Sequence, residues 1–172
     1  LLVAGTGSGE GLATMATIAA EALERPRPIT GLAFRLEDDR WLPWLPPAED
    51  PLYPQFKELQ LQSLGRDYAE QKELLDSLHT QRGEDVFVAS FSGLRDAAGN
   101  VRSYSLWSNG ISTLLPKTDA VAFLRDGGDP LMVAWDRVFD LLCRLMTPQG
   151  LYPERYRVDG YPTPDELAAL SE

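Results

Sequence analysis

Cysteine and histidine are nearly absent from this sequence of 172 residues, which contains one of each, Cys143 and His79. A single cysteine excludes a disulfide within the chain and favours a reducing compartment, so we expect a cytoplasmic location. The Cys/His sets of structural zinc sites are excluded as well. Cys143 lies within an apolar-striped segment and His79 at the end of a Gln/Glu/Lys-rich one, which is unfavourable for nucleophilic catalysis. We predict no metal and no cofactor.

Basic residues are in the minority, with 16 Lys and Arg against 26 Asp and Glu, and the formal net charge is −10. This charge repels a phosphate backbone, so nucleic acid is not expected as a partner. Long apolar runs are also missing, because no segment approaches the roughly 20 apolar residues that cross a bilayer. We therefore expect no association with a membrane.

The chain does contain a glycine-rich start at 1–11, and three nucleotide-binding templates can be tested on it. A P-loop requires Lys after its last glycine, and Glu10 stands there instead. The third glycine of a dinucleotide-binding fingerprint is also replaced by Glu10. The acidic residue that precedes the glycines in methyltransferases using S-adenosylmethionine is replaced by Val3. We interpret 1–11 as an entry segment, with the alternative that a chain beginning at Leu1 is a fragment of a larger nucleotide-binding protein.

Helical periodicity is present on both sides of a proline-rich stretch. Apolar residues at spacings of three and four predict a helix over 12–23, which ends before Pro26. Five prolines in 43–54 predict an extended connector. The composition of 55–81 predicts helix again, divided in two at Gly65.

Strand signals dominate the middle of the chain. Alternation predicts a strand or short hairpin over 31–41, with Asp38 and Asp39 as its turn. Further β-branched and aromatic strands are expected at 84–91, 101–107, 111–115 and 120–124. The first two of these should form a hairpin, and the short loops predict that all of them pair in sequence order as an antiparallel meander.

The last third of the chain is predicted to be mainly helical. Asp129 and Pro130 resemble an N-cap and a first helical residue, and an apolar stripe continues through 130–146. Thr163 and Glu166 match a capping box for a short C-terminal helix. We predict a single α+β domain over 1–172, in which a meander of about four or five strands packs against the C-terminal amphipathic helix, with N-terminal helices around it.

The turn-rich stretch 104–119 combines apolar anchors with hydrogen-bonding groups. Its candidate binding residues are Trp107, Asn109, Lys117 and Asp119. An aromatic anchor flanked by polar groups is typical of a binding face. The alternative interpretation is that Trp107 packs in the core while the polar residues fill turns. A second aromatic and basic patch is expected in the tail, from three tyrosines and two arginines between 152 and 161.

The leading functional hypothesis is a non-catalytic binding or regulatory module that acts through protein contacts or self-association. It predicts an exposed apolar patch near Trp107 or the tyrosine-rich tail. The alternative is a small enzyme or small-ligand-binding protein that uses carboxylates and Lys117. That alternative requires Asp119, or another acid, to converge with Lys117 in a cleft.

Overall fold

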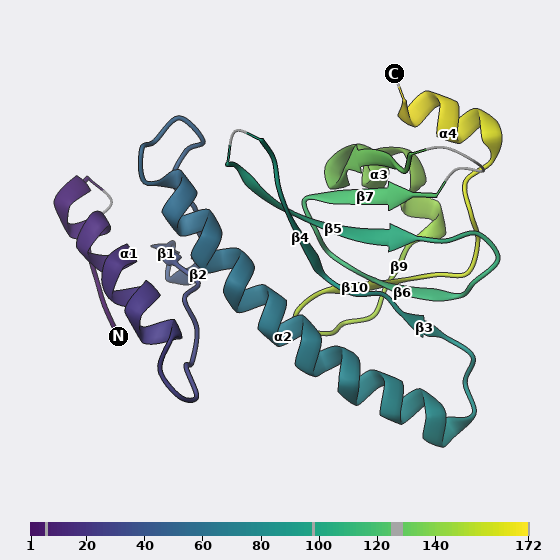
Figure 1. Cartoon of the computed structure of the whole chain (residues 1–172), viewed down its shortest axis with the longest axis horizontal. Helices are drawn as coiled ribbons and strands as arrows, with labels where there is room; N and C mark the ends of the chain where they lie inside the picture. The colour runs from purple at the N-terminus through teal and green to yellow at the C-terminus, as the bar shows by residue number, and fades with distance from the viewer. Residues whose placement is uncertain (6, 98, 125–128, 172) are drawn as a thin grey trace. The chain divides into compact units, whose positions relative to one another are not determined.

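A computed structural model describes residues 1–5, 7–97, 99–124 and 129–171, and its elements are labelled in Figure 1. The chain divides into two compact units. The first comprises Leu1–Leu64 and Asp96–Val101, and the second comprises Gly65–Arg95 and Arg102–Glu172.

The first unit is built on helix α1 (Gly9–Leu23), the hairpin of β1 (Phe34–Glu37) and β2 (Arg40–Pro43), and the N-terminal part of α2 (Tyr53–Arg82). Its core contains the buried side chains of Leu12, Ala16, Phe56 and Leu59. Trp44 and Leu45 of the proline-rich connector pack against this core. Helix α1 begins three residues earlier than expected, because Ser8 accepts a hydrogen bond from the Gly11 N–H and caps it.

The β1–β2 hairpin is closed by a two-residue turn, Asp38 and Asp39. Both residues have positive φ, 47° and 60°. This conformation matches the twist of the flanking strands, and Asp tolerates it better than most side chains do. The hairpin alternative for 31–41 is therefore confirmed.

The second unit contains two four-stranded sheets and the C-terminal part of α2. One sheet has the order β3-β6-β10-β9, from β3 (Phe87–Val88), β6 (Thr113–Pro116), β10 (Arg155–Val158) and β9 (Thr147–Pro148). The other has the order β4-β5-β7-β8, from β4 (Ser92–Arg95), β5 (Val101–Trp107), β7 (Ala120–Phe123) and β8 (Leu131–Ala134). Helix α3 (Trp135–Leu142), a 3₁₀ turn (Cys143–Leu145) and α4 (Pro164–Leu170) complete the unit. The predicted α+β class is confirmed.

The strand connectivity differs from a simple meander. Strand β6 does not pair with its sequence neighbours but joins the other sheet, parallel to β3 and antiparallel to β10. Strands β5 and β7 are thereby brought together as a parallel pair. All four residues of β6 are buried, so the pairing of this strand is decided by contacts with segments that are distant in sequence.

Three predicted boundaries are also corrected. The strand expected at 84–91 is interrupted after Val88, and β4 is the neighbour of β5 instead. The segment 131–134 is the strand β8, because it pairs in register with β7, and helix α3 begins only at Trp135. Gly65 does not divide α2, which is continuous from Tyr53 to Arg82.

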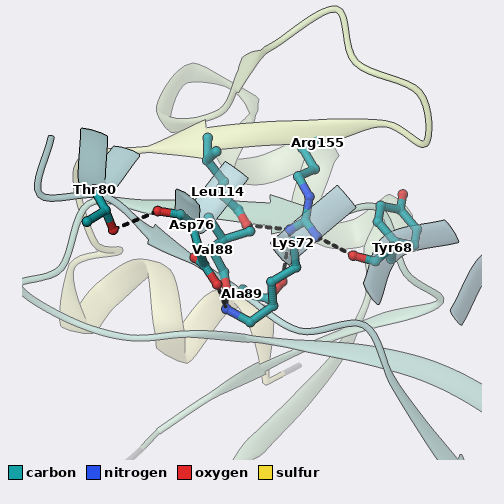
Figure 2. A network of polar contacts seen from close by, with 8 residues as sticks. All are labelled: Tyr68, Lys72, Asp76, Thr80, Val88, Ala89, Leu114 and Arg155. Atoms are coloured by element: carbon teal, nitrogen blue, oxygen red, sulfur yellow. Dashed lines mark hydrogen bonds and ion pairs between the residues drawn. The ribbon is translucent and has the colours of Figure 1, made fainter. Parts of the chain in front are cut away.

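A buried arginine holds the second unit together (Figure 2). Arg155 of β10 is 1% exposed. Its Nη1 donates to the carbonyls of Ala89, at 2.8 Å, and Leu114, at 3.0 Å, and its Nε donates to Gln71 Oε1 at 2.5 Å. Beside it, Lys72 Nζ donates to the Val88 carbonyl at 2.7 Å. Helix α2 is thus joined to the β3-β6-β10-β9 sheet by hydrogen bonds from two cations.

The C-terminal helix α4 begins with the predicted capping box. The Glu166 N–H donates to Thr163 Oγ1 at 3.3 Å, and the Thr163 N–H donates to Glu166 Oε2 at 2.9 Å. These reciprocal bonds satisfy two backbone donors that the helix itself leaves unpaired.

Candidate functional site

Of the predicted binding residues, Trp107 is a core side chain. It is fully buried, its ring centroid lies 5.5 Å from that of Phe123, and its indole N–H donates to the Gly160 carbonyl at 3.1 Å. The alternative interpretation of Trp107 therefore agrees with its position. Asn109 is exposed in the following turn, where Gly110 has a φ of 75°.

Lys117 and Asp119 interact with different partners. Lys117 Nζ lies 3.4 Å from Glu154 Oε1, and both side chains are about half exposed. The Asp119 carboxylate accepts hydrogen bonds from the Ser103 N–H at 2.7 Å and the Ser103 hydroxyl at 2.8 Å. The Asp119 N–H donates in return to Ser103 Oγ at 2.9 Å. These contacts connect β5 to the start of β7. The carboxylate beside Lys117 is that of Glu154, in a pair that is about half exposed to solvent.

The sheet β4-β5-β7-β8 has apolar side chains on both of its faces. Successive residues of a strand point to opposite faces, so the register of β5, β7 and β8 assigns each residue to one face. On the inner face, the directly opposed residues are Ser105, Val121 and Val133 in one row and Trp107, Phe123 and Leu131 in the next. On the other face, which we call the outer face, the rows are Tyr104, Ala120 and Ala134, and Leu106, Ala122 and Met132.

The inner face is covered by helix α3. Trp135, Val138 and Leu142 of this helix belong to the same core cluster as Val121 and Phe123. Figure 1 shows β5 and β7 side by side with α3 next to β7. This cluster is the main core of the second unit.

In most sheets of this kind the face toward solvent carries polar side chains, but the outer face of this sheet is largely apolar. In the two rows named above, the Tyr104 hydroxyl is the one polar side-chain group. Ala120 and Ala122 are 8% and 2% exposed, whereas Met132 of β8 and Leu94 of β4 are 40% and 43% exposed. Because an alanine side chain is a single methyl group, the alanines form a recessed floor between larger neighbours on β5 and β8.

A pocket of about 100 Å³ lies over part of this floor. Four of its lining residues carry polar groups, and they are Arg102, Ser103, Tyr104 and Asp119. The others are apolar, and they are Leu94, Ala120, Met132, Val133 and Ala134. Of the four predicted site residues, the structure places Asp119 at this surface. The alanines and Met132 were missed, although the absence of polar residues at alternate positions of 120–123 and 131–134 indicates a sheet with two apolar faces.

The predicted aromatic and basic patch of the tail is not one surface. Tyr152 is 71% exposed, whereas Arg155 is buried. Tyr156 packs against Trp135, with ring centroids 5.4 Å apart. Arg157 forms an exposed ion pair with Asp159.

Across the described ranges, no group of three or more His, Cys, Asp or Glu side chains is arranged to hold a metal ion. The helices of the same ranges include none with both the length and the apolar character needed to cross a membrane.

Comparison with protein-family models, with curated proteins and with solved structures finds no match to this chain.

Proposed function

We propose that this chain is a non-catalytic binding module that acts through protein contacts, and that the outer face of the β4-β5-β7-β8 sheet is its contact surface. The observation that carries the proposal is the pair of apolar rows on that face, in which Met132 is 40% exposed. Leu94 of β4 lines the same pocket as Met132 and is 43% exposed. Covering apolar surface gains about 25 cal/mol for each Å² removed from water. A partner that covers Leu94, Leu106 and Met132 would obtain this gain.

The contacts of Lys117 and Asp119 support a binding role over an enzymatic one. The bonds between Asp119 and Ser103 hold one end of the outer face in place, and Lys117 forms an exposed ion pair elsewhere. A cytoplasmic location is part of the proposal, because the single thiol, Cys143, is exposed and unpaired and a reducing compartment preserves such a thiol.

Site-specific photocrosslinking tests this proposal. A photoreactive phenylalanine would replace Met132 or Leu94 in the intact protein, and Asp140, which is exposed on α3, would be the control position. We expect defined protein adducts, identified by mass spectrometry, at the first two positions and not at the third. Adducts of equal yield at all three positions, or none at Met132 and Leu94, would refute the outer face as a contact surface.

A further inference from the structure

We propose that the β1 edge, meaning the side of β1 that faces away from β2, is a docking site for an extended strand of a partner protein. The docked strand joins the β1–β2 hairpin as its third strand and carries apolar residues at alternate positions, with an acidic residue opposite Arg35. This site goes beyond the proposed function, because it belongs to the first unit and does not involve the outer face of the second unit.

The β1–β2 hairpin has one apolar face, and every residue of its two strands is exposed. On the apolar face, Leu36 lies opposite Trp41 and Phe34 lies opposite Pro43. Leu36 and Trp41 are 52% and 61% exposed. The other face carries Arg35, Glu37, Arg40 and Leu42. A two-stranded hairpin is only marginally stable in water, whereas three strands with an apolar face form a more stable sheet. The hairpin is therefore suited to accept a further strand.

The register shows which backbone groups point toward the β1 edge. Opposed residues of an antiparallel pair alternate between pairs that exchange hydrogen bonds and pairs that do not. The Trp44 N–H donates to the Ala33 carbonyl at 2.9 Å, so these two residues form a bonded pair. By alternation, Phe34 and Leu36 direct their N–H and C=O groups away from β2. The sheet consists of β1 and β2, so within the ranges that the structure describes no third strand bonds to these groups.

The free edge of β2 is a poorer site for a strand. By the same alternation, the residues of β2 whose backbone groups point outward are Trp41 and Pro43. Proline has no N–H to donate, and proline on an edge strand is a common means of preventing further pairing. Phe34 and Leu36 each offer a donor and an acceptor on the β1 edge. A docked strand therefore forms more hydrogen bonds with β1 than with β2.

A second copy of the chain fits the β1 edge less well than a partner strand does. If two β1 strands paired antiparallel through both Phe34 and Leu36, Arg35 of each copy would lie opposite Arg35 of the other. Like charges in directly opposed positions destabilise a sheet. Shifting the register to place Arg35 opposite Glu37 brings Phe34 opposite Asp38 of the turn, which has a φ of 47° and is not extended. Only Leu36 would then pair.

The side chains of β1 define the pattern of the docked strand. Directly opposed residues share a face, so residues opposite Phe34 and Leu36 lie on the apolar face and should be apolar. Arg35 and Glu37 form an exposed ion pair on the charged face. An acidic residue opposite Arg35 and a basic residue opposite Glu37 would extend this pair into a row of alternating charge.

A short extended peptide, Thr-Lys-Val-Glu-Val-Thr-amide with an N-terminal fluorophore, provides the probe. Antiparallel to β1, its valines lie opposite Leu36 and Phe34 and its glutamate lies opposite Arg35. N-methylation of both valines removes the N–H groups that pair with the β1 edge, whereas N-methylation of the lysine and the glutamate changes groups that point away from it. The full chain is titrated into each peptide and binding is followed by anisotropy. We expect saturable binding with a Kd below about 1 mM, weakened about tenfold or more by the first modification and less than about twofold by the second.

Substitutions of Leu36 provide the same contrast in the protein. Leu36→Pro removes the outward N–H without removing a bond between β1 and β2, and it should weaken binding about fivefold or more. Leu36→Val retains the N–H and an apolar side chain and should change the affinity by less than about twofold. The NMR signal of the Trp44 amide, which bonds to Ala33, reports whether the hairpin remains closed in each variant.

A charge exchange tests the position of Arg35. Arg35→Glu should weaken binding of the peptide about two- to fivefold, and a peptide with lysine in place of its glutamate should restore the affinity.

Several results would overturn the proposal. They are the absence of saturable binding, equal affinity of the two N-methylated peptides, or unchanged affinity in a Leu36→Pro variant whose hairpin is closed. A dimer in sedimentation that Leu36→Pro abolishes would assign the β1 edge to a second copy and reject the partner strand. Photocrosslinks at Met132 and Leu94 report on the outer face alone, so a failure there is distinct from a failure at the β1 edge.

Discussion

The guanidinium of Arg155 lies over the ring of Tyr68, with its carbon 5.2 Å from the ring centroid, and its Nη2 donates to the Tyr68 carbonyl at 3.3 Å. The acceptors around this buried cation are uncharged: an amide oxygen of Gln71 and three backbone carbonyls. Burial lowers the pKa of Arg155 to about 10, and the nearby Tyr68 opposes that shift. Arg155 is still protonated at neutral pH and acts there as a structural connection between β10 and α2.

Replacing Arg155 with methionine should therefore destabilise the protein strongly. The variant keeps a long side chain but leaves the Ala89 carbonyl and the Gln71 amide oxygen without their donor. Unsatisfied buried groups cost about 1–3 kcal/mol each, so we expect a loss of about 3 kcal/mol in the free energy of unfolding. Urea unfolding measures it. Arg157→Met, which breaks an exposed pair, is the control and should cost less than about 1 kcal/mol. Equal stability of the two variants would contradict this role of Arg155.

Tyr68 should make the stability of the folded protein depend on pH in the alkaline range. Burial raises the pKa of Tyr68 well above its ordinary value of 10.0, although its hydrogen bond to Lys117 acts in the opposite direction. A raised pKa means that the folded protein favours the protonated phenol, so this contribution to stability is complete below pH 10 and decreases as the pH rises above it. Tyr68→Phe has no such group. Above pH 10, the free energy of unfolding of the wild type should therefore decrease relative to that of Tyr68→Phe. A difference between the two proteins that stays constant with pH would exclude the effect.

Asp119 and Lys117 should differ in their importance for stability. Asp119→Ala removes the acceptor for both the N–H and the hydroxyl of Ser103, which is buried, and should cost about 1–3 kcal/mol. Lys117→Met breaks an ion pair with Glu154 that is about half exposed, and should cost less than about 1 kcal/mol. Thermal unfolding of the two variants would reveal the difference, and a larger loss in Lys117→Met would contradict these assignments.

In the first unit, Ser63 is expected to be sensitive to substitution. Its hydroxyl is buried and accepts a hydrogen bond from the Gly31 N–H at 2.8 Å. Ser63→Ala leaves that N–H without a partner and should cost about 1–3 kcal/mol in urea unfolding. Ser90→Ala, at an exposed position, is the matched control and should be nearly neutral.

Gly31 itself should not tolerate a side chain. A Cβ at this position would lie 2.8 Å from Leu23 Cδ1 and 3.1 Å from Ser63 Oγ. Gly31→Ala should therefore reduce stability through overpacking, typically by about 1–3 kcal/mol. A variant as stable as the wild type would show that the Leu23 side chain moves aside freely.

Local signals in the sequence were sufficient for several elements. The turn at Asp38 and Asp39 and the capping box of Thr163 and Glu166 depend on residues close together in the chain, and both were predicted correctly. The glycine at position 65 misled the prediction, because one glycine costs a helix only about 1 kcal/mol and packing against the rest of the unit outweighs that cost.

The residues of 131–134 show why other elements could not be predicted. Leu131 and Ala134 fit a helical stripe that continues into Trp135, but Leu131 and Val133 also alternate as a strand does. Pairing with β7 decides between these alternatives, and that pairing depends on a segment elsewhere in the chain. The candidate site was located only in part for the same reason, since Asp119 and Met132 come to one surface through the sheet register.

The sequence by itself determined the α+β class, the acidic charge and the failure of the glycine-rich start to match a nucleotide-binding template at Glu10 and Val3. These properties depend on composition and on short-range spacing. Only the tertiary structure decided that β6 pairs in a different sheet from β5 and β7, its neighbours in sequence. It also decided that Arg155 is buried among carbonyls and that the alanines of β7 form the floor of an apolar face. The physical reason is that strand pairing and burial are set by contacts between distant segments, and the pattern of one segment is compatible with several such pairings.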